Sequence, residues 1–140
     1  MKFKKYATIA LVGVATLAIA EPQIKQVIKI LGVGVAVKQF GPQINKEINK
    51  LSKHTDTPAE TTRVVPIITI GVGDTSYVGA AQVTGPKWKV DKVAAVAEPS
   101  IMLFKEIKVN ALIPVSSKDV IKDIKTVQGV GVTGIVDLRL

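Results

Sequence analysis

Residues 63–84, RVVPIITIGVGDTSYVGAAQVT, decide the fold class because they predict a β-hairpin. Residues 63–70 are rich in β-branched side chains, which favour a strand, and residues 76–84 supply the returning strand. The glycine-containing segment 71–75 predicts the turn between them. Pro66 has no N–H to give to a neighbouring strand, so it predicts that the first strand lies at an edge or contains a bulge.

Helices are predicted on both sides of this hairpin. Before it, Gly41-Pro42 starts a helix, with proline at a position favoured in the first turn. The apolar stripe of that helix consists of Ile44, Ile48 and Leu51. After the hairpin, Gly85-Pro86 repeats the same pair of residues and predicts the start of a second helix. The apolar face of the second helix consists of Val90, Val93, Ala94 and Ala97.

The C-terminal third continues this alternation of strands and helices. Residues 107–115 predict a strand, and Ser116 with Asp119 resembles the capping box that begins a helix. The side chains that this helix would bury are Val120, Ile121, Ile124 and Val127. Gly129 is expected to end the helix, and residues 130–140 predict a final strand.

The segment before the first of these helices decides the topology. Residues 22–31 have apolar positions at helical spacing and predict a short amphipathic helix. Residues 32–37 alternate glycine with apolar residues, and two glycines cost a helix about 2 kcal/mol relative to alanine, which favours a strand. With a strand at 33–40, residues 33–115 run β-α-β-β-α-β, the ferredoxin-like order. We therefore expect an α+β fold: a mostly antiparallel sheet, helices on one face and a C-terminal αβ extension.

The first twenty residues predict an exported protein. Residues 1–5 contain three lysines, residues 7–17 are apolar, and Ala18-Ile19-Ala20 gives a small-x-small ending before Glu21-Pro22. This is the layout of a cleavable secretory signal peptide, with cleavage after Ala20. The apolar run is shorter than the roughly 20 residues needed to span a bilayer. An uncleaved leader with a membrane-associated hairpin is the alternative.

The domain organisation follows from this leader. We expect a signal peptide at 1–20, an N-terminal segment at 21–41 with the amphipathic helix and candidate strand, and a single α+β domain at 42–140. The chain contains no cysteine and no N-x-Ser/Thr sequon, which excludes a disulfide framework and thiolate metal ligands. Export without either feature favours the bacterial periplasm, cell wall or extracellular space. Arg63 and Arg139 are the only arginines, which disfavours specific nucleic-acid binding.

One family shares the pattern of residues 43–115. A lysine-rich helix is followed by the strand–turn–strand segment ITIGVGDTSYVGAAQVTG, the predicted helix KVDKVAAVA and the strand IKVNALIPV. This α-β-β-α-β layout resembles the BON domain of bacterial envelope proteins. The C-terminal VQGVGVTGIVDLRL is similar to that family's closing strand, but it comes one α-β unit too late for a single domain. The resemblance implies a non-enzymatic role at an envelope surface, with phospholipid binding.

The candidate site consists of lysines on the three predicted helices of the domain. They are Lys46, Lys50, Lys53, Lys87, Lys89, Lys92, Lys118, Lys122 and Lys125. Helices on one sheet face would make their outer sides a single basic surface for phospholipid head groups or an acidic wall polymer. The alternative is that these lysines form the ordinary solvated sides of amphipathic helices. Trp88, which lies between two of them, predicts either an interfacial anchor or a cover for the edge of the core.

No catalytic residue, metal or cofactor is predicted. Gly129, Gly131 and Gly134 match G-x-G-x-x-G, but the predicted helix precedes them and the strand follows, the reverse of a dinucleotide site. His54, the only histidine, begins the polar loop 54–62 and lacks the partners of a zinc site, so it is expected to be solvated. Ser116 and Ser117 are more simply helix caps than nucleophiles.

The expected function is therefore a non-catalytic envelope module with a basic surface. A protein-interaction module or homodimer that pairs through a sheet edge is the second hypothesis. A small hydrolase is the third, and it would need scattered carboxylates to be brought together by folding.

Overall fold

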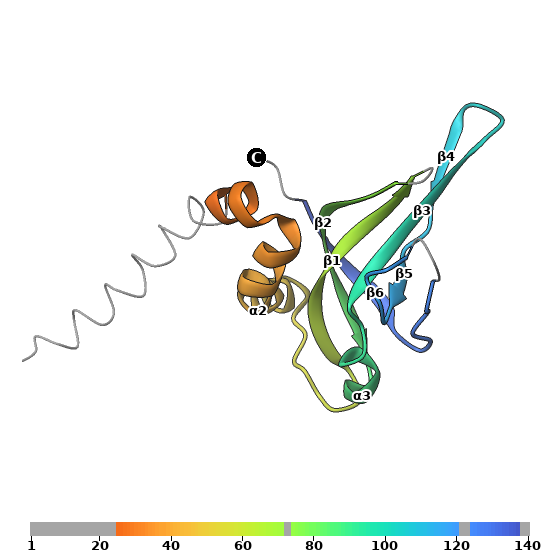
Figure 1. The fold of residues 1–140 in the computed structure, drawn as a ribbon. Helices are drawn as coiled ribbons and strands as arrows, with labels where there is room; N and C mark the ends of the chain where they lie inside the picture. The colour runs from red at the N-terminus through yellow and green to blue at the C-terminus, as the bar shows by residue number, and fades with distance from the viewer. Residues whose placement is uncertain (1–24, 72–73, 121–123, 138–140) are drawn as a thin grey trace, which may run out of the picture.

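The computed structural model describes residues 25–71, 74–120 and 124–137, and it shows an α+β fold with a mostly antiparallel, curled sheet (Figure 1). The elements are α2 (Val33–Ser52), β1 (Thr61–Gly71), β2 (Asp74–Gly85), α3 (Lys87–Val90), β3 (Ala95–Leu103), β4 (Ile107–Asn110), β5 (Ile113–Val115) and β6 (Gly131–Val136). The strand order is β4-β3-β1-β2-β6, and β5 also pairs with β3. The predicted fold class is confirmed. The predicted signal peptide lies outside the described residues.

The predicted hairpin forms the centre of the sheet. β1 and β2 are antiparallel from the Thr61–Gly85 pair to the Gly71–Asp74 pair. β1 is not an edge strand, because β3 runs parallel to it on the other side. The pairing of β1 with β3 begins only at Ile67. Pro66 precedes it, so its missing N–H removes no hydrogen-bond donor from the β1–β3 ladder. The predicted bulge is found immediately afterwards, as a register shift against β2 between Ile67 and Ile68.

The two faces of the sheet are buried by different parts of the chain. Val64 and Ala80 lie under α2, where they pack with Val37. The neighbouring residue Val65 points to the opposite face and packs with Val90 of α3. α2 thus covers one face, and the short helix α3 contributes to the core on the other.

The predicted strand at 33–40 is wrong, because these residues form the first half of α2. Residues 25–31 are helical as predicted, and Gly32, with φ of 92°, separates that turn of helix from α2. The segment is helical because its apolar residues pack on the sheet at helical spacing: Val33, Val37, Ile44 and Ile48 all contact the cluster around Val64. Burial of this stripe outweighs the low helix propensity of the glycines. The ferredoxin-like order is therefore absent, and the expected boundary at 41/42 falls inside a helix.

Pro42 lies inside α2 and does not begin it, contrary to the prediction. Proline has no N–H, so the carbonyl of Lys38 lacks its usual donor in the helix. We expect Pro42→Ala to raise the free energy of unfolding by about 1–3 kcal/mol, measured by urea denaturation. Gln39→Ala, at an exposed position one turn earlier, is the control and should change it by less than about 0.5 kcal/mol. A loss of stability in Pro42→Ala would contradict this expectation and show that packing around the proline ring outweighs the missing hydrogen bond.

The second predicted helix is much shorter than expected. Helix α3 ends at Val90, and Ala97, predicted on its apolar face, belongs to β3. Ala95, Val96 and Ala97 pair with β5. The predicted strand 107–115 is present in two parts, β4 and β5, and the N–H of Ala111 between them donates to the carbonyl of Pro99 at 3.0 Å.

The predicted helix after Ser116 is also wrong, because residues 116–120 and 124–127 are not helical; residues 121–123 lie outside the described part. Ser116 and Lys125 instead lie side by side, because the N–H of Ser116 donates to the carbonyl of Lys125 at 2.9 Å. The hydroxyl of Ser117 accepts the N–H of Asp119 at 3.1 Å, so it closes a turn and does not cap a helix. The final strand, predicted at 130–140, is present as β6 over Gly131–Val136; residues 138–140 lie outside the described part.

β3 and β4 extend beyond the rest of the sheet as a two-stranded arm (Figure 1). Its turn contains Phe104 and Lys105 with positive φ angles of 54° and 65°. Large apolar side chains of the arm are exposed, namely Ile101, Met102, Leu103, Phe104, Ile107 and Val109. Within the described part of the chain, no helix has both the length and the apolar character to cross a membrane.

Candidate functional site

The lysines predicted as one surface are distributed over separate parts of the fold. Lys46, Lys50 and Lys53 belong to α2 and its C-cap. Lys87, Lys89 and Lys92 lie on or just after α3. Lys118 and Lys125 lie in the connection between β5 and β6, and Lys122 is outside the described residues. The basic surface made by three helices is not formed, because the third helix is absent from the described residues.

Trp88 is exposed, so its interpretation as a cover for the core edge is wrong. The side chain is 61% exposed. The ammonium groups of Lys89 and Lys92 lie 5.2 and 4.9 Å from the centre of its ring, within cation–π distance. Lys87 instead pairs with Asp91 at 2.8 Å. The role of Trp88 as an interfacial anchor stays a prediction.

A cleft of about 570 Å³ lies between α2 and β1. Its apolar lining includes Val37 from the helix and Val64 and Pro66 from the strand. α2 approaches β1 closely at Gly41, where a Cβ atom would lie 3.3 Å from the carbonyl oxygen of Val64. The cleft therefore has a wall of small and apolar residues, and a larger residue at Gly41 would have to push the helix away.

Three cationic residues are among those that line this cleft: Lys38 from α2, Arg63 from β1 and Lys118 from the β5–β6 connection. Among the described residues no carboxylate lines it. Arg63 is held in place because its Nη1 donates to the carbonyl oxygens of Val90 at 3.3 Å and Val93 at 2.8 Å. We call this site the basic cleft. Of its three cations, the sequence analysis selected only Lys118.

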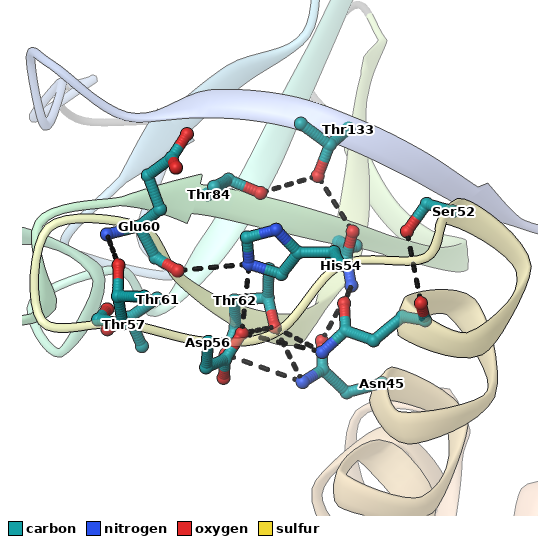
Figure 2. Close-up of polar contacts among 12 residues, drawn as sticks. Asn45, Ser52, His54, Asp56, Thr57, Glu60, Thr61, Thr62, Thr84 and Thr133 are labelled. Atoms are coloured by element: carbon teal, nitrogen blue, oxygen red, sulfur yellow. Dashed lines mark hydrogen bonds and ion pairs between the residues drawn. The ribbon is translucent and has the colours of Figure 1, made fainter.

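A polar network beside the basic cleft fixes α2 on the sheet (Figure 2). Gln82 of β2, only 2% exposed, donates to Oδ1 of Asn45 at 3.0 Å and Oδ1 of Asn49 at 2.8 Å. Its own oxygen accepts the hydroxyl of Thr133 in β6 at 2.8 Å. Both asparagines donate to Oγ1 of Thr62 in β1, at 2.9 and 2.8 Å. Every described buried side-chain N or O atom has a partner, so this network is structural.

His54 belongs to the same region, and its expected solvation is only partly correct (Figure 2). Its Nε2 lies 3.0 Å from the carbonyl oxygen of Glu60 and 3.2 Å from Oδ1 of Asp56. Both partners are acceptors, so Nε2 carries a proton. Asp56 also accepts the hydroxyl of Thr62 at 2.7 Å, which connects this loop to the network. No group of three metal-ligating side chains occurs among the described residues.

A scan against protein-family models and searches of curated proteins and of solved structures found no match. Residues 43–115 do contain a helix, two strands, a helix and a strand in that order. However, the second helix has only four residues, and β3 begins at Ala95, inside the segment predicted as helical. The resemblance to the BON domain therefore stays a prediction.

Proposed function

We propose that this chain is an exported, non-catalytic envelope protein that binds anionic head groups in the basic cleft. The observation that supports this proposal is the convergence of Lys38, Arg63 and Lys118 on one apolar-walled cleft without a described carboxylate. These residues come from three separate parts of the chain. Their convergence is therefore a property of the fold.

The chemistry of the basic cleft favours a ligand with an anionic group on an apolar body. Lysines attract phosphate as mobile point charges, whereas the guanidinium of Arg63 offers a planar set of donors at a fixed position. Val37 and Val64 provide apolar surface for the adjoining carbon chain. Known ligand pockets range from roughly 300 to 1,000 Å³, and the cleft of about 570 Å³ lies within that range. Without residues 1–20, which hold three lysines and no acid, the chain keeps 16 basic and 11 acidic side chains, and this net charge of +5 would attract an anionic surface at long range.

The test is sedimentation of the protein with vesicles. We expect binding to vesicles that contain phosphatidylglycerol, no binding to phosphatidylcholine vesicles, and weaker binding at roughly 0.15 M salt than at low salt. Soluble polyphosphate distinguishes the two sources of the anion: competition by polyphosphate at equal phosphate concentration would favour an acidic polymer, and no competition would favour lipid. Absence of binding to both would overturn the proposal.

Paired substitutions separate the basic cleft from general surface charge. Lys38→Ala combined with Lys118→Ala should weaken binding roughly 25-fold, since each lysine near an anionic surface contributes about 1 kcal/mol. Lys46→Ala combined with Lys50→Ala is the matched control, because it makes the same change in charge at two lysines of α2 that do not line the cleft. Equal weakening by both pairs would instead support the diffuse lysine surface.

A further inference from the structure

A second surface lies at the free edge of the sheet, where residues of α2 and of the end of β6 line one groove. This mainly apolar groove of about 320 Å³ lies between them, lined by Phe40, Ile44, Ile48, Leu51, Ile135 and Val136, with Gln43 and Glu47 of α2 also in its lining. Leu51 is 86% exposed and Ile135 is 67% exposed. Leu51 was predicted on the buried stripe of its helix, and it continues that stripe beyond the sheet without being covered. We call this surface the edge groove.

β6 is an edge strand without the usual protection against pairing. It is hydrogen-bonded to β2 on one side and is last in the strand order, so its other side is open among the described residues. Its sequence, GVTGIV, contains no charge and no proline. Charged residues and proline are the common means by which edge strands avoid pairing with other chains. The opposite edge differs, because β4 carries Lys108.

The position of α2 over β6 is fixed by close contact. A Cβ atom at Gly134 would lie 3.3 Å from Cγ2 of Ile48, so a larger residue there would require the Ile48 side chain to shift by a few tenths of an ångström. A strand added to the free edge of β6 would consequently lie beside the exposed part of the helix. Its backbone would pair with β6, and its apolar side chains would cover Leu51.

We propose that the edge groove is a homodimer interface in which β6 pairs antiparallel with β6 of a second copy of this chain. A two-fold axis brings the same patch of both copies together, so the patch must be self-complementary. The edge groove meets this condition, because each copy supplies both an open, uncharged strand edge and an apolar helix stripe. Antiparallel self-pairing through β4, with Ile107 opposite Val109, would instead place Lys108 opposite the same lysine.

Mass measurement by light scattering after gel filtration tests this proposal, which does not depend on anion binding. At micromolar concentrations we expect a dimer that persists at high salt. Leu51→Lys and Ile135→Lys should each weaken dimerisation about tenfold or more. Ile101→Lys is the matched control, because Ile101 is 60% exposed on β3 and should leave the dimer intact. Circular dichroism would establish that each variant is folded.

The absence of cysteine allows a second, independent test. Single cysteine substitutions made in turn at Val132, Thr133 and Ile135 of β6 should give a disulfide-linked dimer on mild oxidation at the position next to the two-fold axis, because only there does a residue of an antiparallel pair lie opposite its own equivalent. Ile101→Cys should give no disulfide-linked dimer. A monomer at every concentration would overturn the proposal, and so would a dimer unaffected by the Leu51 and Ile135 variants. Dimerisation abolished only by Ile101→Lys would assign the interface to the opposite edge.

Discussion

Gln82→Leu is expected to lower the free energy of unfolding by about 2–4 kcal/mol, because it removes three part-buried hydrogen bonds of a buried side chain at once. Leucine would leave Oδ1 of Asn45, Oδ1 of Asn49 and the hydroxyl of Thr133 without their present partner. Each unsatisfied buried polar group costs about 1–3 kcal/mol, and relaxation toward water reduces the sum. Urea denaturation would measure the change.

An exposed glutamine provides the matched control for this substitution. Gln39→Leu, on the exposed side of α2, should change the free energy of unfolding by less than about 0.5 kcal/mol. If Gln82→Leu were as stable as the wild type, the asparagines would have found other partners, and the network would not hold α2 on the sheet. The substitution also reports on function, since the basic cleft and the edge groove both require α2 in this position.

Gly79→Val should lower the free energy of unfolding by about 2–3 kcal/mol and displace the end of β6. A Cβ atom at this position would lie 2.8 Å from the carbonyl oxygen of Val136, which is backbone and cannot rotate away. β2 and β6 pair at this point, through Ala80 and Val136. Urea denaturation gives the loss of stability, and dimerisation should weaken with it.

Gly131→Val is the matched control, because a Cβ atom there would meet nothing within 4 Å. We expect a neutral or slightly stabilising effect, since valine favours strands and restricts the unfolded chain. Equal losses in the two variants would indicate that β6 tolerates no side chain in place of glycine, and that close contact at Gly79 is not the cause.

Local patterns predicted the hairpin at 63–84 because its two strands are neighbours in sequence and share one turn. The error at 33–40 has a physical cause: GVGVAV fits a strand period, whereas Val33, Val37, Ile44 and Ile48 also fit a helix. Only contact with Val64 and Ala80 selects the helix. Ala95 and Val96 are likewise drawn into a strand by β1 and β5, which are distant in sequence.

The basic cleft could be predicted only in part. Lys118 was selected, but on a helix that does not form, and nothing local relates it to Lys38 or Arg63. Their convergence requires the loop after β5 to return toward α2, and this is set by long-range pairing. The lysines that flank Trp88 in the sequence indicated an exposed, interfacial position, and the side chain is exposed in the structure.

The β3–β4 arm and the centre of the sheet are expected to open at different rates. From Ile67 to Ile70, β1 is held between two neighbouring strands, so the amides of this part reach solvent only when the whole sheet opens. Residues 100–103 pair with β4 alone, and an isolated two-stranded ribbon is marginally stable in water. The arm can therefore fray and close many times while the centre of the sheet stays folded. The conformation in which its exposed apolar side chains face solvent changes each time.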